Sequence, residues 1–167
     1  FNGYIWLLQL KLDDSDTMQE IDKDSTRDEN RPVLTLGVTS QLSGIPAHSI
    51  RQYVEKGLII PFKLDSKRHL FSMNDVKRLK NIQFLIHEQG LNFSGIRTLL
   101  ALVPCWNLIK CSKEDQQNCE AYKANSTPCW EASEKGQACK NKSCRECNVY
   151  LWLSNSTDLK AFLKELA

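Results

Sequence analysis

Apolar residues recur at helical spacing through the middle of the chain, and turn residues divide that stretch into short segments. The first segment predicts a helix from Val38 to Ser43, ended by Gly44. After a tight turn at Gly44-Ile45-Pro46, a second helix is expected to run to about Lys56. The pattern therefore predicts two short helices joined by a glycine turn.

A small hairpin is expected to follow these helices. The stretch FKLDSKRHLF, residues 62–71, alternates polar and apolar side chains around Asp65-Ser66, as hairpins do. Ser72 with Asp75 three residues later fits a capping box, in which each residue bonds the backbone of the other. A further helix is therefore expected to begin directly after the hairpin.

That helix has a broad apolar face and is expected to end at Gly90. Asn92 then caps another helix, which Pro104 stops. Two short helices followed by a hairpin are typical of a winged helix-turn-helix. An ordinary helical hairpin packed on a small sheet is the alternative that the pattern leaves open.

The two ends of the chain differ from this middle. Residues 1–32 are polar and acidic and predict a flexible lead-in, whereas residues 104–150 show little apolar periodicity and hold all seven cysteines. A terminal helix is expected from roughly Thr157 to Leu166. We therefore expect a mainly α-helical chain with four parts: an N-terminal segment (1–32), a winged helix-turn-helix domain (33–103), a loop-rich cysteine module (104–150) and a C-terminal helix (151–167).

Charge is unevenly distributed along the chain. Residues 1–31 have 4 basic and 8 acidic side chains, residues 32–103 have 9 and 4, and residues 104–167 have 9 and 8. The middle part therefore has a net charge of +5 and is the part suited to an anionic polymer, although a solvated surface would also account for it.

The predicted helix-turn-helix has side chains suited to DNA. The second helix could enter a major groove N-terminus first. Its early exposed positions would be Ala47, His48, Ser49 and Gln52, with Arg51 placed on a phosphate. The hairpin brings Lys67, Arg68 and His69 to its tip or just past it, where they would contact the DNA backbone.

These residues resemble the DNA-binding domain of the MerR family of bacterial regulators. The resemblance covers Leu36 to Leu100 and rests on Leu42-Ser43-Gly44, Ser49-Ile50-Arg51-Gln52-Tyr53, Gly57-Leu58, Leu70-Phe71-Ser72 and Asp75-Val76. IRQYVEKGLI and HEQGLNFSGI are most similar to the heat-shock repressor (HspR) branch.

The resemblance implies specific binding to double-stranded promoter DNA as a homodimer on an inverted repeat, with RNA polymerase as a further partner. It implies that Arg51 and Tyr53 contact the DNA backbone and that His48 and Ser49 lie near bases. The chain departs from the family at His69, where arginine is common, and at Pro104, where the family continues with a long dimerisation helix. The mode of dimerisation is therefore left open.

The cysteine module contains a duplicated unit. Residues 104–122 and 128–150 both begin Pro-Cys-Trp and both end Cys-x-x-Tyr. The first copy has Cys105, Cys111 and Cys119, and the second has Cys129, Cys139, Cys144 and Cys147. The paired Pro-Cys-Trp motifs resemble the two-CW cysteine-rich module of some bacterial signalling proteins.

A thiolate metal centre is the expected use of these cysteines. With no histidine in the region, Cys129, Cys139, Cys144 and Cys147 are the simplest ligand set, with Cys105, Cys111 and Cys119 as a second site, part of a shared site, or a decayed copy. The irregular spacing favours an iron–sulfur cluster, with zinc as the alternative; switching disulfides or direct binding of a soft metal are further readings. Because Cys105 closely follows Val103, we expect a change at the centre to reach the DNA-binding part there.

The sequence predicts a cytoplasmic protein without a membrane partner, because the longest apolar run near its start, Tyr4 to Leu8, is too short to cross a bilayer. The chain shows no Ser/His/Asp or Cys/His set, and we expect no enzymatic activity. We expect a DNA-binding regulator that senses redox state or metal. A repressor with a structural zinc module used for dimerisation and an iron–sulfur electron-transfer subunit are the alternatives.

Overall fold

The computed structural model describes residues 29–64 and 68–165. The N-terminal segment therefore lies almost entirely outside the described residues, and so does Lys67. Within them, the first half of the chain consists of β1 (Leu34–Thr35), α2 (Leu36–Ser43), α3 (Ala47–Glu55), β2 (Phe62–Lys63), β3 (His69–Phe71), α4 (Met73–His87) and α5 (Phe93–Ala101). The second half consists of α6 (Cys105–Leu108), α7 (Lys113–Gln117), α8 (Glu120–Lys123), the 3-10 turn η1 (Cys129–Glu131), α9 (Gln137–Lys140), the 3-10 turn η2 (Cys144–Glu146), α10 (Asn148–Asn155) and α11 (Leu159–Glu165).

The predicted helix-turn-helix is confirmed. The Thr35 side chain caps α2 by accepting from the backbone of Val38, so the helix begins two residues earlier than its pattern predicts. Gly44 ends α2 in the left-handed region at φ 74°, which glycine adopts without a steric penalty. The Ser43 hydroxyl then accepts from the backbone N–H of Ile45, and this bond fixes the turn into α3.

The predicted hairpin is confirmed and belongs to a three-stranded sheet. Strands β2 and β3 pair antiparallel, with Lys63 opposite His69. On the other side of β3, strand β1 pairs Leu34 with Phe71. Strand β1 was not predicted, because two residues are too short to show an alternating pattern.

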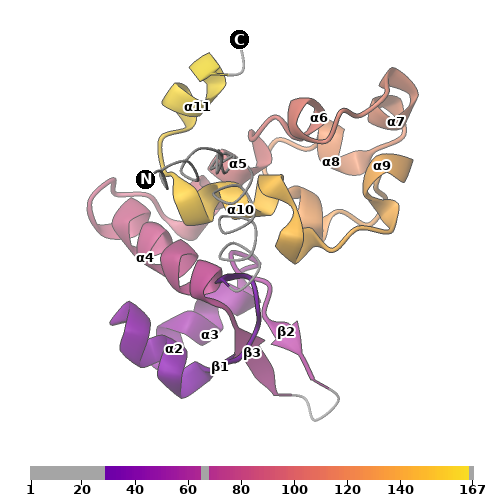
Figure 1. Ribbon diagram of the computed structural model, residues 1–167. Coiled ribbons are helices and arrows are strands. Elements are labelled where there is room, and N and C mark those ends of the chain that lie inside the picture. Colours follow the sequence, from indigo (N-terminus) through magenta and orange to yellow (C-terminus); the bar gives the residue numbers. More distant parts are fainter. Residues whose placement is uncertain (1–28, 65–67, 166–167) are drawn as a thin grey trace, which may run out of the picture.

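Helix α4 begins at the expected capping box, in which Ser72 and Asp75 each accept from the backbone of the other. It lies between α2 on one side and α10 on the other (Figure 1). Its buried residues Leu79, Ile82 and Leu85 belong to the main hydrophobic core.

Helix α10 completes that core from the far end of the chain. Val149, Trp152 and Leu153 pack against α4, and the Asn81 amide donates to the backbone carbonyl of Leu153 at 2.7 Å. The expected boundary between residues 150 and 151 therefore falls inside one helix. The expected C-terminal part (151–167) overlaps the second half of α10, but a separate helix beginning at Asn148 was not predicted, because its pattern merges with that of the cysteine stretch.

The terminal helix α11 begins at Leu159, two residues later than expected, after Asp158 accepts from the backbone of Ala161. It lies at the end of the molecule opposite the strands (Figure 1). Among the described residues, no helix is both long and apolar enough to cross a membrane. The mainly α-helical fold class with a winged helix-turn-helix and a cysteine-containing C-terminal region is confirmed.

Candidate functional site

Helix α3 presents a polar face to solvent. His48, Arg51 and Gln52 are exposed, and Ser49 is half-buried. Opposite them, Ile50 is fully buried in the core and anchors the helix. The residues predicted to meet bases and phosphate thus lie together on the outer face of one helix.

The wing lies beside this helix. Arg68 and His69 are exposed, and the Arg68 carbonyl accepts from the backbone of Leu64 to close the hairpin. His69 and Arg51 line the same surface hollow of about 220 Å³, so the helix and the wing form one continuous surface. The structure brings together the predicted contact residues that it describes on α3 and the wing.

Tyr53 differs from the others because it is only 5% exposed. Its ring packs edge-on against Phe93 at a centroid distance of 5.8 Å, and burial raises its pKa. Its contact with the DNA backbone, implied by the family resemblance, stays a prediction.

A cavity of about 40 Å³ lies within the cysteine module. Its walls include all seven cysteines, both tryptophans of the Pro-Cys-Trp motifs and both tyrosines of the Cys-x-x-Tyr motifs. All seven cysteines are free thiols, and Cys119 is buried. Thiols from both copies therefore face a common space, which we call the thiol cavity.

The duplicated unit has a structural counterpart in aromatic packing. In the first copy Trp106 meets Tyr122 edge-on at 5.2 Å, and in the second Trp130 meets Tyr150 edge-on at the same distance. The last cysteine of each copy also precedes a helix directly, as Cys119 does α8 and Cys147 does α10. The two copies have therefore kept related geometry as well as related sequence.

Polar contacts join the two copies into one unit. The Asp115 carboxylate accepts from the backbone of Gln137 at 2.8 Å, and the Glu120 carboxylate accepts from the backbone of Ser133 at 3.1 Å. A Cβ added at Gly136 would lie 3.1 Å from the backbone oxygen of Asp115, so glycine permits this close approach.

The thiols of the two copies lie close enough to interact electrostatically. Burial, and then the neighbouring thiols Cys119, Cys139 and Cys111, raise the pKa of Cys105 to about 11. Burial and neighbouring thiols likewise raise the pKa of Cys129 to about 12, against the opposing charge of Lys135. Both thiols are therefore protonated at neutral pH unless a cation replaces the proton.

The Lys135 ammonium donates to the sulfur of Cys144 at 3.3 Å and to the Trp130 carbonyl at 3.4 Å.

Among residues 29–64 and 68–165, no three His, Cys, Asp or Glu side chains are grouped so as to hold a metal ion. The four-cysteine ligand set therefore stays a prediction.

The second copy also contacts the segment that joins α3 to the wing, residues 56–61, which we call the wing linker. The Trp130 indole donates to the Gly57 carbonyl at 2.8 Å, and the Tyr150 hydroxyl accepts from the backbone of Ile60 at 2.9 Å. These two bonds span sequence separations of 73 and 90 residues. They hold both ends of a short, irregular stretch of backbone.

Two arginines add charged contacts around the wing linker. Arg145 donates to the Ile60 carbonyl and pairs with the Asp75 carboxylate at 2.6 Å. Arg97 donates to the Lys56 carbonyl at 2.8 Å and pairs with Glu131 at 2.5 Å. The Arg145 and Asp75 side chains are 14% and 2% exposed, so this pair is shielded from solvent, and removing either partner would leave an unpaired buried charge.

Arg78 of α4 lies at the centre of these contacts and is fully buried. It donates to the Leu58 carbonyl at 2.7 Å and also to the Tyr150 carbonyl. Its guanidinium carbon lies 5.0 Å from the Trp130 ring centroid and 4.0 Å from that of Tyr150. Burial lowers its pKa, while the flanking aromatic faces and carbonyls favour the cation.

The sequence analysis did not find these linking residues. For Arg78 the sequence does hold a signal: it lies four residues before Ile82, so a charged side chain occurs on the apolar face of its helix. Arg145 and Tyr150 left no comparable trace, because their partners are 70 to 90 residues away in sequence.

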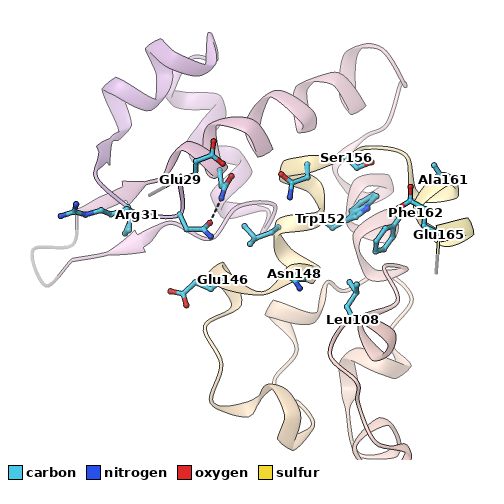
Figure 2. Close-up of a pocket in the computed structure, with 15 residues that line it drawn as sticks. Glu29, Arg31, Leu108, Glu146, Asn148, Trp152, Ser156, Ala161, Phe162 and Glu165 are labelled. Atoms are coloured by element: carbon cyan, nitrogen blue, oxygen red, sulfur yellow. Dashed lines mark hydrogen bonds between the residues drawn. The ribbon is translucent and has the colours of Figure 1, made fainter. Parts of the chain in front are cut away.

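A second hollow, of about 1100 Å³, lies between the start of the described chain, α10 and α11. Figure 2 shows Trp152 and Phe162 next to each other on its wall, with ring centroids 5.8 Å apart. The hollow contains none of the predicted DNA-binding or metal-ligating residues.

Comparison with known proteins identifies the first half of this architecture. Residues 34–102 match the sequence model of the family described as MerR HTH family regulatory protein. A Streptomyces coelicolor protein named as heat shock protein HspR is 32% identical over 74 residues, which are 44% of this chain and 49% of that protein. The regulator GlnR of Bacillus anthracis and that of Bacillus cereus are each 38% identical over 71 residues, which are 42% of this chain and 54% of theirs.

The chain thus spans about half the length of the curated relatives it matches. The matched family and the GlnR relatives are named as regulators rather than enzymes, in agreement with the expectation that the chain is not an enzyme. The match ends at residue 102, just before the cysteine module begins.

Proposed function

We propose that the whole chain is a transcriptional regulator that binds double-stranded promoter DNA, because its residues 34–102 match the MerR helix-turn-helix family and regulators related to it. The observation that carries the proposal is the continuous surface of α3 and the wing, where His48, Arg51 and His69 face outward together. Helix α3 would enter the major groove, and the wing would contact the adjacent backbone.

The positive charge of this part supports the proposal. Its net charge of +5 attracts the phosphate backbone, and Arg51, Lys63 and Arg68 are exposed beside the polar face of α3. A homodimer on an inverted repeat is the proposed assembly, with RNA polymerase as a further partner at the promoter.

We extend the proposal to sensing. The thiol cavity would hold a metal centre, with an iron–sulfur cluster on Cys129, Cys139, Cys144 and Cys147 as the expected form and zinc as the alternative. Its walls support this, because they contain sulfur donors and no histidine or carboxylate, which suits soft metals. Binding, loss or oxidation of the centre would then report metal supply or redox state.

The wing linker offers the path from the centre to DNA. Three residues that hold α3 and the wing in place follow second-copy cysteines closely, as Cys129-Trp130, Cys144-Arg145 and Cys147-Asn148-Val149-Tyr150. A shift of these cysteines would change the angle between α3 and the wing, and with it the fit to the groove. This route adds to the one expected through Cys105 and Val103.

DNA binding is tested by selecting duplexes from a random pool with the full chain and measuring affinity over a range of salt. We expect a selected site bound roughly 10³-fold or more tightly than unrelated DNA, with affinity falling steeply as salt rises. Equal affinity for selected and unrelated duplexes would contradict the proposal.

Sensing is tested on the selected duplex by comparing protein isolated without oxygen with the same protein after chelation. We expect affinities that differ by about 5- to 150-fold, the usual range for coupled sites. Equal affinities would leave a DNA-binding protein whose cysteine module is only structural, as in the zinc-scaffold alternative.

A further inference from the structure

The second-copy cysteines share their cavity with the cysteines of the first copy. The walls of the thiol cavity include Cys105, Cys111 and Cys119 of the first copy and all four cysteines of the second. The two copies are also joined directly beside this cavity, since the Asp115 carboxylate of the first copy accepts from the backbone of Gln137 of the second at 2.8 Å. The first-copy thiols are therefore neither remote from the second nor turned away from it.

We propose that the two copies build one polynuclear metal–thiolate centre, with ligands from both, inside the thiol cavity. No three His, Cys, Asp or Glu side chains of the described residues are grouped to hold an ion, so metal binding must draw the thiols inward from the cavity walls. This inference rests on the proposed sensing function and names the ligand set of that same site. It differs from a centre held by the second copy alone, whether a single ion or a cluster, and from two separate centres.

The number of donors argues for more than one metal atom. A single tetrahedral ion uses four thiolates, so three of the seven sulfurs would face the cavity without a role. A polynuclear centre uses more sulfurs, and thiolates that bridge its metals share their charge between them. The volume of about 40 Å³ exceeds the roughly 10–15 Å³ that a cavity needs to hold one water, so the space is not limited to a single small ion.

The remaining walls suit such an occupant. Trp106 with Tyr122 and Trp130 with Tyr150 form equivalent aromatic pairs on the two copies, and both pairs line the cavity. Aromatic walls exclude water, which protects a cluster and adjusts its potential. Lys135 already donates to the Cys144 sulfur and would offset part of the negative charge of the thiolates.

The asymmetry of the copies gives the occupant a fixed orientation. Where the second copy has Cys144, the first copy has Gln116, whose amide donates to the carbonyl of Cys111 at 3.1 Å. The second copy therefore supplies four donors and the wing-linker contacts, while the first closes the opposite wall with three.

The test begins with the reduced full chain titrated with cadmium under argon, with the thiolate-to-cadmium charge-transfer absorption as the readout. The same titration is repeated on Cys105→Ser and Cys111→Ser, and on Asn107→Ser as the matched control. Asn107 is exposed on the same short helix as Cys105 and does not line the cavity. Circular dichroism verifies that each variant is folded, and Cys111 on the half-exposed wall serves if Cys105→Ser unfolds.

We expect the wild type and Asn107→Ser to bind more than one cadmium ion per chain. Each first-copy cysteine variant should bind fewer cadmium ions, and its affinity for the remaining ions should be at least tenfold lower than that of the wild type. The inference is overturned if the wild type stops at one ion, or if first-copy changes leave the second copy's ions with unchanged affinity and spectrum. Elemental analysis of protein isolated without oxygen then distinguishes iron with inorganic sulfide from zinc or copper.

DNA affinity measured on the same samples separates this inference from the proposed function. If first-copy variants keep the full centre and its effect on DNA, the shared centre is wrong and sensing stands. If the shared centre forms but leaves DNA affinity unchanged, the shared centre stands and sensing is wrong.

Discussion

The guanidinium carbon of Arg78 lies 4.0 Å from the ring centroid of Tyr150, and this pair joins the helix-turn-helix domain to the cysteine module. Arg78 belongs to α4, and Tyr150 ends the second copy of the duplicated unit. Because Arg78 also bonds Leu58 in the wing linker, one buried side chain contacts three parts of the fold.

Replacing Arg78 with alanine should destabilise the whole chain. The change removes two bonds to buried carbonyls and two cation–π contacts, and we expect a loss of about 3–5 kcal/mol in the free energy of unfolding. Urea denaturation followed by circular dichroism measures it. Lys80→Ala, at an exposed position of the same helix, is the control and should stay within about 0.5 kcal/mol of the wild type. A loss for Arg78→Ala as small as that of the control would show that the two parts are stable independently.

Gly57 and Gly90 offer a matched pair. Both have positive φ, 68° and 67°, so alanine at either should cost about 1–2 kcal/mol through backbone strain. A Cβ at Gly57 would also lie 1.6 Å from a carboxylate oxygen of Glu131, whereas one at Gly90 meets nothing within 4 Å. Gly57→Ala should therefore displace Glu131 from Arg97 and cost up to about 1 kcal/mol more.

A Glu131→Ala background distinguishes strain from displacement at Gly57. With the carboxylate gone, the two glycine substitutions should cost the same in thermal or urea unfolding. An excess at Gly57 that persists in this background would mean that the wing linker is strained for another reason.

The helix-turn-helix was readable from sequence because its determinants are local. Gly44, the Ser72–Asp75 capping box and the pairing of the hairpin strands each act within a few residues, and each is present in the structure. Strand β1 and helix α10 were not predicted, for two different reasons. The strand is too short to have a period, and α10 follows directly on the irregular cysteine stretch and is stabilised by packing on α4.

Trp130→Phe should weaken the connection between the thiol cavity and DNA. Phenylalanine keeps an aromatic ring beside Tyr150 but loses the N–H that donates to Gly57. We expect the ratio of operator affinities between metal-loaded and stripped protein to move toward one. Fluorescence anisotropy with a labelled duplex measures both affinities.

Trp106→Phe is the control for this experiment, because Trp106 occupies the equivalent place in the first copy and packs on Tyr122. For this variant, the ratio of operator affinities between metal-loaded and stripped protein should equal that of the wild type. Equal ratios for the two variants would exclude the Trp130–Gly57 bond as the path.

Arg51→Ala should weaken binding to all duplexes by a similar factor, because a phosphate contact does not depend on sequence. The slope of log affinity against log salt should fall in magnitude by about one, the contribution of a single phosphate contact. Lys160→Ala removes a charge from exposed α11, at the opposite end of the molecule from the wing, and should leave the slope unchanged (Figure 1). A change at Lys160 equal to that at Arg51 would mean that only overall charge matters.

Gln52→Ala should behave differently from Arg51→Ala. A side chain that reads a base costs about 1–3 kcal/mol at its preferred base pair and relaxes selectivity there. Repeating the duplex selection with the variant measures this, and an unchanged preferred sequence would assign Gln52 to the backbone instead.

The candidate site was only partly readable from sequence. The duplication showed that the thiols form related sets, but spacing alone could not tell that both sets face one cavity. The contacts that join the module to the wing linker were beyond reach, because they pair residues such as Trp130 and Gly57 across 73 positions. Such pairs leave no periodic trace, since neither partner affects the local structure of the other.

Helix α10 has a consequence for how this architecture can be altered. Since Leu153 and its neighbours complete the core beside α4, the DNA reader cannot be fused to a foreign receptor simply by cutting the chain after Val103. Any replacement must bring its own amphipathic helix to cover the surface left bare. Exchange of C-terminal modules during evolution or in engineering is thereby limited to modules that supply such a covering helix.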